Sequence, residues 1–210
     1  MTQQATAARE HLLALAESSP VALQLEPDTR GVTIRLDNPR LDWYHSFVTG
    51  ALARRAQQAD QALLRACNNK QRNIASVLDL TAGWGADSLT LARHGQRVRL
   101  LEQNSLLAGI LDYSLACLAA TDAGPETTAG MRVDCVNSAE FLQTPDSKDA
   151  FDCIYLDPMF PAHKSNARPG KEMQILQALT GNSDIEQCFE LALARARRRV
   201  VVKRPADDGV

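Results

Sequence analysis

Residues 76–87 constrain the fold more than any other part of the chain. They read as a short apolar strand, a turn of small residues and the first turn of a helix. Gly83 and Gly85 let the backbone turn tightly and approach a ligand closely, because glycine has no Cβ. In α/β proteins a strand, a Gly-x-Gly turn and a helix N-terminus together form a nucleotide-type binding site. We therefore expect a ligand at this loop.

Strands and helices alternate from residue 76 onward. We expect strands at 76–80, 97–102, 131–136, 151–156 and 199–203, and helices at 87–94, 105–119, 171–180 and 184–196, with a short helix near 138–142. This alternation favours an α/β fold with a doubly wound, Rossmann-like parallel sheet and right-handed crossovers. Ligands of such sheets bind at the carboxyl ends of the strands, where the strand order reverses.

The residues before this alternation predict a small extension that packs on the core. We expect a helix at 5–17, a hairpin of strands at 21–25 and 32–36, and helical structure over 51–67. Two readings stay open for 42–55. One is a linker anchored by aromatic residues and followed by a helix; the other is a segment that packs over the glycine loop or contacts substrate phosphates through Arg54 and Arg55. The chain thus divides into an extension, 1–72, and a ligand-binding core, 73–210. The polar segment 120–130 is expected to be a surface connection.

Composition excludes several classes of protein. A chain of 210 residues with 45% hydrophobic and 23% charged residues is typical of one globular domain. Its net charge of -2 excludes a globally basic nucleic-acid binder, although not a local basic face. No apolar run is long enough for a membrane span, and residues 1–10 do not resemble a signal peptide.

Cysteine and histidine usage points to a cytoplasmic protein without a metal site. The five cysteines are odd in number and include no C-x-x-C pair, so we expect reduced, mostly buried thiols. The four histidines are scattered rather than spaced as metal ligands are.

Glu102 ends the second predicted strand of the core. An acidic residue at this place can accept hydrogen bonds from the hydroxyl groups of a ribose. The alternative is a solvated carboxylate at a strand end, but the glycine loop favours the ribose role. A nicotinamide-dependent oxidoreductase uses the same pair of features. However, Ser88 stands where its fingerprint has a third glycine.

The turn that follows strand 151–156 decides the class of chemistry. Two prolines within 157–161 fix a stiff, extended turn. The carboxylate of Asp157 and the carbonyl of Pro158 are neighbouring acceptors, which suit an exocyclic amino group with its two donors. Phe160 offers a face on which a base can stack, worth about 1–3 kcal/mol. The alternative is a turn capped by a buried aromatic side chain, but the acidic, proline and aromatic residues all fall at the expected strand end.

The glycine loop, the strand-end Glu102 and the Asp-Pro-Met-Phe turn resemble class I S-adenosylmethionine-dependent methyltransferases. Longer runs are similar to the ribosomal RNA small subunit methyltransferase J family: 79–85, 155–161 followed by 171–173, Phe-Val-x-Gly at 47–50, and 200–205. The likeness covers about residues 31–205. It implies methyl transfer from S-adenosylmethionine to N2 of a guanosine in 16S rRNA, with 16S rRNA or the 30S subunit as the partner.

The resemblance also implies the site residues. The expected cofactor-binding residues are Asp79, Gly83, Gly85, Ala86, Asp87, Glu102, Gln103, Asn137, Ser138 and Asp157. Asp157, Pro158 and Phe160 are the expected catalytic residues. Two departures stand out: Ala86 replaces an arginine that is common in the family, and with an end at Val210 the last β-hairpin of the class I sheet is expected to be missing.

Basic residues follow the proline turn directly. His163, Lys164, Arg168 and Lys171 are expected to hold RNA phosphates, and the target guanine has to leave any duplex to reach the pocket. Arg195, Arg197, Arg198, Arg199, Lys203 and Arg204 form a second basic cluster, for which a charged helix end beside a buried strand is an equal reading. Two alternatives remain: a methyltransferase for another planar amino group, of DNA adenine or protein glutamine, and a non-catalytic RNA-binding homologue.

Overall fold

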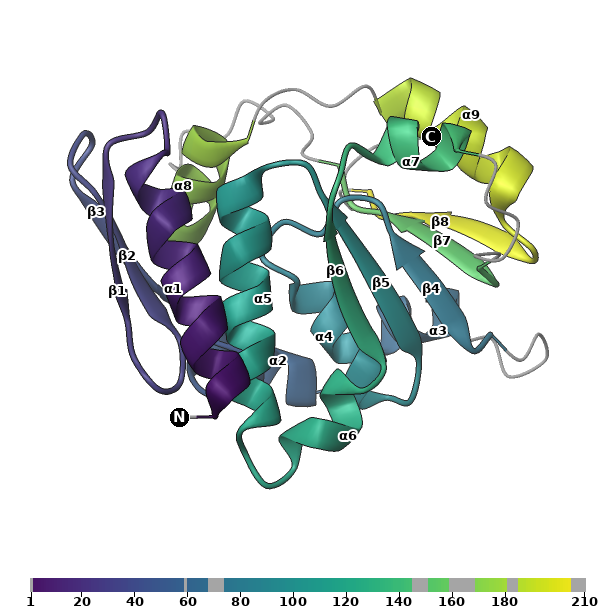
Figure 1. Ribbon diagram of the computed structural model, residues 1–210. Coiled ribbons are helices and arrows are strands. Elements are labelled where there is room, and N and C mark those ends of the chain that lie inside the picture. Colours follow the sequence, from purple (N-terminus) through teal and green to yellow (C-terminus); the bar gives the residue numbers. More distant parts are fainter. Residues whose placement is uncertain are drawn as a thin grey trace.

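The computed structural model describes residues 2–58, 60–67, 74–144, 151–158, 169–180 and 185–204. These residues include a five-stranded sheet in which every neighbouring pair of strands is parallel (Figure 1). The strands are β4 (Ser76–Asp79), β5 (Arg97–Glu102), β6 (Met131–Cys135), β7 (Cys153–Leu156) and β8 (Arg199–Val202), in the order β6-β5-β4-β7-β8.

The strand order reverses between β4 and β7. From β4 the chain moves outward through β5 to the edge strand β6, and it then returns to place β7 on the other side of β4. The predicted doubly wound parallel sheet is therefore confirmed. The crossover helices are α4 (Ala86–Arg93), α5 (Ser105–Ala119), α6 (Gly124–Thr128), α7 (Ser138–Gln143), α8 (Lys171–Leu179) and α9 (Ile185–Arg195).

The two faces of the sheet bury separate hydrophobic clusters, because side chains alternate along a strand. Val77 and Tyr155 point into a cluster that includes residues of α4 and α5. Their neighbours Leu78 and Ile154 point into a second cluster with residues of α7 and α9. Helices on both faces explain why every residue of the central strands β4 and β7 is buried.

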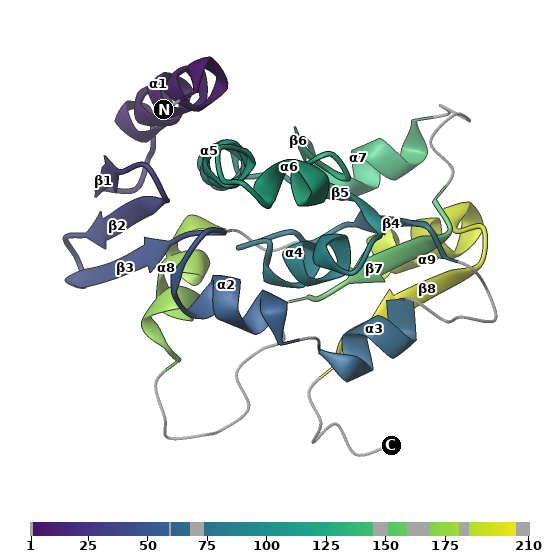
Figure 2. The ribbon, with the colours of Figure 1, turned by 90° about the horizontal axis from the view of Figure 1, so that it is seen from below.

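The extension before the sheet contains α1 (Gln3–Glu17), β1 (Leu23–Pro27), β2 (Val32–Leu36), β3 (Leu41–His45), α2 (Gly50–Gln57) and α3 (Gln61–Cys67). The first three strands form an antiparallel sheet in sequence order. Figure 2 shows α1 lying against α5, and β3 beside α8. Val32 and Ile34 of β2 belong to the same hydrophobic cluster as α4 and α5, so the extension shares the core. The division at residue 72 stays a prediction.

Three local predictions were wrong. The hairpin has a third strand, β3, whose Trp43 and His45 pair with Ile34 and Val32 of β2 rather than forming a linker. The helical segment 51–67 is two helices, because the Asp60 carboxylate accepts hydrogen bonds from the backbone at the start of α3 and so begins a new helix. The segment 120–130 contains the short helix α6, with a proline in its first turn.

Within the part of the chain that the structure describes, no helix is long and apolar enough to cross a membrane.

Candidate active site

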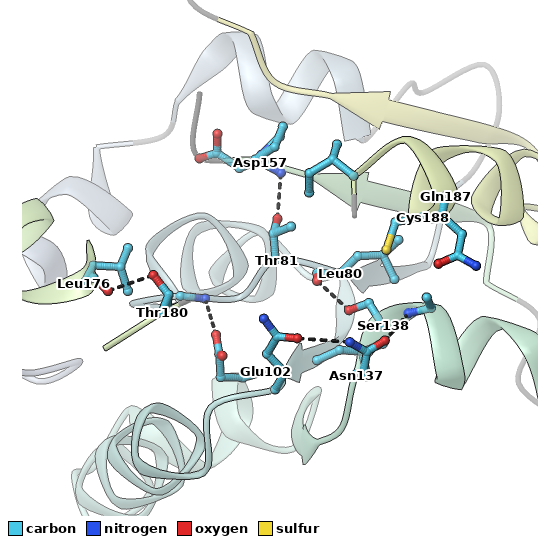
Figure 3. A pocket seen from close by; sticks show the side chains of 16 residues that line it. Leu80, Thr81, Glu102, Asn137, Ser138, Asp157, Leu176, Thr180, Gln187 and Cys188 are labelled. Carbon is cyan, nitrogen blue, oxygen red and sulfur yellow. Dashed lines mark hydrogen bonds between the residues drawn. The ribbon is translucent and has the colours of Figure 1, made fainter. Parts of the chain in front are cut away.

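The carboxyl ends of β4, β5 and β7 and the residues after β6 surround a cavity of about 270 Å³. This is close to the lower end of the roughly 300–1,000 Å³ that is common for ligand sites. Its position at the reversal of strand order is the one that doubly wound sheets use for ligands. The lining residues are Leu80, Thr81, Gly83, Leu101, Glu102, Gln103, Asn137, Ser138, Ala139, Asp157, Pro158, Leu176, Thr180, Ile185, Gln187 and Cys188 (Figure 3).

The two glycines after β4 have different tasks. Both have a left-handed backbone, with φ of +50° at Gly83 and +70° at Gly85, which favours glycine. Gly83 lines the cavity, and a Cβ there would meet no atom closer than 3.6 Å. A Cβ on Gly85 would lie 2.8 Å from both Phe47 Cζ and Leu111 Cδ2. Gly83 therefore forms the side of the loop that faces the cavity, whereas Gly85 lets the loop pack closely on the core.

Glu102 is buried at the end of β5 and holds the glycine loop. Its Oε2 accepts a hydrogen bond from the Gly83 N–H at 3.1 Å, and its Oε1 accepts one from the Asn104 N–H at 2.8 Å. Burial raises the pKa of this carboxyl group, and the backbone donors oppose that rise. Each carboxylate oxygen can accept a second hydrogen bond, so Glu102 can bind hydroxyl groups of a ligand in the cavity.

The residues after β6 form the neighbouring wall. Asn137 caps α7 through Oδ1, which accepts from the Ala139 N–H at 2.9 Å and the Glu140 N–H at 3.2 Å. Its Nδ2 donates to Gln103 Oε1 at 3.0 Å. Ser138 Oγ donates to the carbonyl oxygen of Leu80 at 2.6 Å, as Figure 3 shows. These contacts fix the polar side chains of this wall to the ends of β4 and β5.

Asp157 stands on the opposite wall, directly after β7. Its backbone N–H donates to Thr81 Oγ1 at 2.7 Å, and its Oδ2 accepts from Lys203 Nζ at 2.7 Å. Lys203 Nζ also donates to Asp87 Oδ2 at 2.7 Å, and the Tyr155 hydroxyl donates to the same oxygen at 2.6 Å. Burial raises the pKa of Asp157, and the Lys203 ammonium group opposes this rise.

Asp79 lies beneath the loop rather than in the cavity. It is 2% exposed, and its carboxylate accepts hydrogen bonds from the Thr81 N–H at 3.0 Å and Ser88 Oγ at 2.6 Å. Burial, opposed by these two donors, raises its pKa to about 7. Asp79 therefore braces the turn between β4 and α4.

The extension holds the same loop from behind, through His45. This fully buried histidine places Nε2 3.0 Å from the Trp84 carbonyl oxygen and Nδ1 2.8 Å from Ser114 Oγ. Since a carbonyl can only accept, Nε2 carries the proton and Nδ1 accepts from the serine hydroxyl. Burial lowers the pKa of His45 to about 4, so the ring is neutral. Trp84 Nε1 in turn donates to the Glu172 carbonyl oxygen at 3.0 Å and joins the loop to α8.

Comparison with known proteins assigns the chain to a family. The family model described as "Putative SAM-dependent methyltransferase" matches residues 6–209. The ribosomal RNA small subunit methyltransferase J of Thioalkalivibrio sulfidiphilus is 38% identical over 97% of this chain and 82% of that protein. The protein belongs to the ribosomal RNA small subunit methyltransferase J family. The member from Nitrosococcus oceani is 36% identical over 83% of this chain and 74% of its own length.

A solved structure agrees with this assignment. A SAM-dependent methyltransferase from Neisseria gonorrhoeae superposes with a TM-score of 0.65 at 25% identity, covering 93% of this chain and 81% of that one. As a member of a SAM-dependent methyltransferase family, the protein uses S-adenosylmethionine as its cofactor.

The structure brings together most of the cofactor residues expected for this methyltransferase family. Gly83, Glu102, Gln103, Asn137, Ser138 and Asp157 all line the cavity. Asp79, Gly85, Ala86 and Asp87 are not among the lining residues. The Asp87 carboxylate instead meets Lys203 and Tyr155. A direct cofactor contact of these four residues stays a prediction.

Most residues expected to contact the substrate lie outside the described part of the chain. Phe160, His163, Lys164 and Arg168 lie outside the described residues. Pro158 lines the cavity beside Asp157. Lys171, at the start of α8, forms an exposed ion pair with Asp42 of β3 at 2.9 Å. The second basic cluster makes contacts within the molecule: Arg198 pairs with Asp152 at 3.3 Å, and Arg199 donates to the Ala66 carbonyl oxygen.

Sequence reasoning missed the part of the cavity wall that α8 and α9 supply. Leu176, Thr180, Ile185, Gln187 and Cys188 belong to these helices or lie at the α8 C-terminus, and no motif marks them. A signal did exist for His45, because Trp43 and His45 alternate with polar residues as strand residues do.

Proposed function

We propose that this protein transfers a methyl group from S-adenosylmethionine to the exocyclic N2 of a guanosine in 16S rRNA of the small ribosomal subunit. One observation carries the proposal: Asp157 and Pro158 line the same cavity as Glu102. An acceptor pair suited to an amino group thus shares one cavity with a carboxylate suited to a ribose. The names of its relatives, ribosomal RNA small subunit methyltransferase J, supply the class of RNA.

The wall formed by β4, β5 and the residues after β6 is the proposed cofactor half. Glu102 would accept hydrogen bonds from the ribose hydroxyl groups, while Asn137 and Ser138 would flank the base. Gly83 lets the ligand approach the backbone, because no Cβ stands in the way. When bound, the cofactor supplies a methyl group on a positively charged sulfur, and the electrons of the broken carbon–sulfur bond remain on that sulfur.

The wall after β7 is the proposed substrate half. The Asp157 carboxylate and the Pro158 carbonyl would accept the two hydrogens of guanine N2 and so orient the nitrogen lone pair. The lone pair would form the new bond to the methyl carbon, and N2 would then lose one proton, which the Asp157 carboxylate would accept and pass to water. Phe160 would stack on the guanine, as its place in the turn predicts.

The proposed partner is the 30S subunit or its 16S rRNA, which places the protein in the cytoplasm. His163, Lys164, Arg168 and Lys171 would contact phosphates beside the target, because basic side chains after the turn can fix the register of the RNA. The target guanosine would be extruded from its stack to reach the cavity.

Labelled methyl transfer tests this proposal. The substrates are 16S rRNA and 30S particles that lack the modification, with duplex DNA and a glutamine-containing peptide as competing amino groups. We expect N2-methylguanosine in the RNA or the particle. We expect a loss of roughly 100-fold or more in kcat/KM for Asp157→Ala, in line with the removal of a group that orients a reacting atom.

The control variant is Asp122→Ala, which removes an exposed carboxylate in the turn before α6. It should keep the activity of the wild type. Label on adenine or glutamine would replace the proposed substrate. Binding of S-adenosylmethionine and RNA with no transfer to any substrate would instead identify a non-catalytic RNA-binding homologue.

A further inference from the structure

We propose that Lys203 is a positioning residue for the methyl-accepting half of the site: it holds the Asp157 carboxylate in place and keeps it ionised. This inference rests on the proposed role of Asp157 toward the substrate amino group. Lys203 is not itself among the residues that line the cavity. It acts through Asp157, whose Oδ2 lies 2.7 Å from its Nζ.

The register of the sheet brings Lys203 to this place. In the pairing of β7 with β8, Leu156 lies opposite Val202, and the Lys203 N–H donates to the Leu156 carbonyl oxygen at 2.8 Å. The next residue of β7 is Asp157, so the last backbone hydrogen bond of the pair sets Lys203 beside it. The ammonium group and the carboxylate are therefore neighbours because of backbone geometry.

The contacts of Lys203 differ from those of an ordinary surface ion pair. Its Nζ joins two carboxylates from two elements: Asp157 after β7 and Asp87 in α4, each at 2.7 Å. The Tyr155 hydroxyl fixes the same oxygen of Asp87 at 2.6 Å. A cation that is shared by two oriented carboxylates is more restrained than an isolated exposed pair, whose contribution to stability is small.

The charges around Asp157 explain why it needs a cation. Among the described residues, Lys203, in the segment after β8, faces Asp157 with a positive charge. Asp87 of α4 and Asp79 of β4 add negative charge nearby. The Tyr155 hydroxyl group, on β7, is the remaining titratable neighbour. Burial and Asp87 both raise the pKa of Asp157, and only Lys203 lowers it. Without Lys203, no described cation would offset the effect of burial and of the Asp87 charge on Asp157.

The sign of the expected pH effect follows from this arrangement. Asp157 can take a proton from the amino group only when it is ionised, so activity falls as the pH drops through its pKa. Loss of Lys203 raises that pKa further, and the acidic limb of the pH profile moves to higher pH.

The test measures kcat/KM against pH for the wild type, Lys203→Met and Lys203→Arg. At pH values below the pKa of Asp157 we expect Lys203→Met to lose about tenfold, the size of a shift of one pKa unit. Most of the loss should be regained near pH 9. Lys203→Arg should keep most of the activity, while the Kd for S-adenosylmethionine changes less than about threefold in both variants.

Arg132→Met is the matched control. Arg132 lies on β6, the opposite edge strand, and forms an ion pair with Asp134 at 2.9 Å. Its removal should leave the pH profile unchanged. If the profile of Lys203→Met coincides with that of the wild type, Lys203 has no positioning role. A loss by the same factor at every pH would overturn the inference that Lys203 keeps Asp157 ionised.

A second measurement separates this inference from the proposed function. The ¹³C shift of the Asp157 carboxyl group, followed by NMR from pH 3 to 9 without substrate, reports its pKa in the wild type and in Lys203→Met. A higher pKa in the variant supports the inference even if no RNA is methylated, in which case the proposed function alone would fail. An unchanged pKa overturns the inference whatever the activity.

Discussion

The two halves of the cavity hold their carboxylates in different ways. Glu102 is fixed by two backbone donors, the N–H groups of Gly83 and Asn104. Asp157 donates its own N–H to Thr81, but its carboxylate is held by a side chain, Lys203. Any sequence that folds into this loop supplies the backbone donors, whereas the lysine has to be encoded. The proposed cofactor half is thus a property of the fold, and the proposed substrate half a property of particular side chains.

Solvent exposure follows the same division. Glu102 is 6% exposed, whereas the side chain of Asp157 is 38% exposed and that of Lys203 48% exposed. Exposed ion pairs are screened by salt, and buried hydrogen bonds from the backbone are not. Cofactor binding should therefore tolerate salt changes that alter transfer to the RNA.

The largest effect should come from Glu102→Ala. This change removes the proposed ribose acceptor and leaves the N–H groups of Gly83 and Asn104 without their partner. Hydrogen bonds to a charged group are worth about 1.5–3 kcal/mol each, so two of them predict a Kd for S-adenosylmethionine weaker by roughly 100-fold or more. Calorimetry measures this Kd, with Glu140→Ala, an exposed carboxylate on α7, as control. A change below threefold would contradict the assignment of Glu102.

The burial of His45 behind the glycine loop predicts that the free energy of unfolding depends on pH. His45 has a folded pKa of about 4 against an ordinary value of 6.5. The unfolded chain therefore takes up a proton first, and His45 lowers the free energy of unfolding by roughly 3 kcal/mol as the pH falls from 7 to 4. Asp79, with its pKa raised to about 7, acts in the opposite direction over this range.

The difference in the free energy of unfolding between the wild type and His45→Gln isolates the contribution of His45. Urea unfolding of the wild type and of His45→Gln at pH 7, 5.5 and 4 compares a group that titrates with one that does not. The stability of the wild type relative to the variant should decrease toward pH 4. If the difference in the free energy of unfolding is the same at every pH, His45 is not held neutral. Its hydrogen bonds to Trp84 and Ser114 would then not join the glycine loop to the extension as described.

The sequence predicted the halves of the site unequally, and the physical reason is the range of the interactions. Gly83 and Glu102 were predicted because the end of an apolar strand can be recognised in the sequence from the turn that follows it. Ligands of parallel sheets bind at such strand ends. The strand ends also predicted Asp157. These signals are local in the chain, and the parallel sheet then brings them together.

The contacts that were missed join residues far apart in the sequence. Lys203 meets Asp157 only because β8 lies next to β7, and strand order is not visible in a pattern of apolar residues. The pairing of His45 with Ser114 likewise depends on where the small antiparallel sheet packs. Leu176 and Cys188 look like core residues of amphipathic helices, and only the packing of α8 and α9 places them at the cavity.

The glycine loop offers a sharper test of what the fold requires within the cofactor half. Gly85→Ala would set a methyl group 2.8 Å from Phe47 Cζ and Leu111 Cδ2 on a left-handed backbone, so we expect a loss of about 2–3 kcal/mol in stability. Gly83→Ala meets nothing closer than 3.6 Å and should cost about 1 kcal/mol. Gly83→Ala should instead weaken binding of the cofactor, because its Cβ lies at the cavity. Thermal unfolding and calorimetry measure both effects, and equal losses of stability would contradict this division of tasks.

Thr81 joins the two halves, and its variants should give the smallest effect. Its N–H donates to Asp79 at 3.0 Å, and its Oγ1 accepts the Asp157 N–H at 2.7 Å. Thr81→Val keeps the shape but leaves that N–H without an acceptor, which costs about 1 kcal/mol and predicts a loss of roughly fivefold in kcat/KM. Thr81→Ser keeps the hydroxyl group and should retain the activity of the wild type. If Thr81→Val weakens the Kd for S-adenosylmethionine and leaves transfer to RNA unchanged, Thr81 belongs to the cofactor half. Lys203 would then be the only described side chain that fixes Asp157.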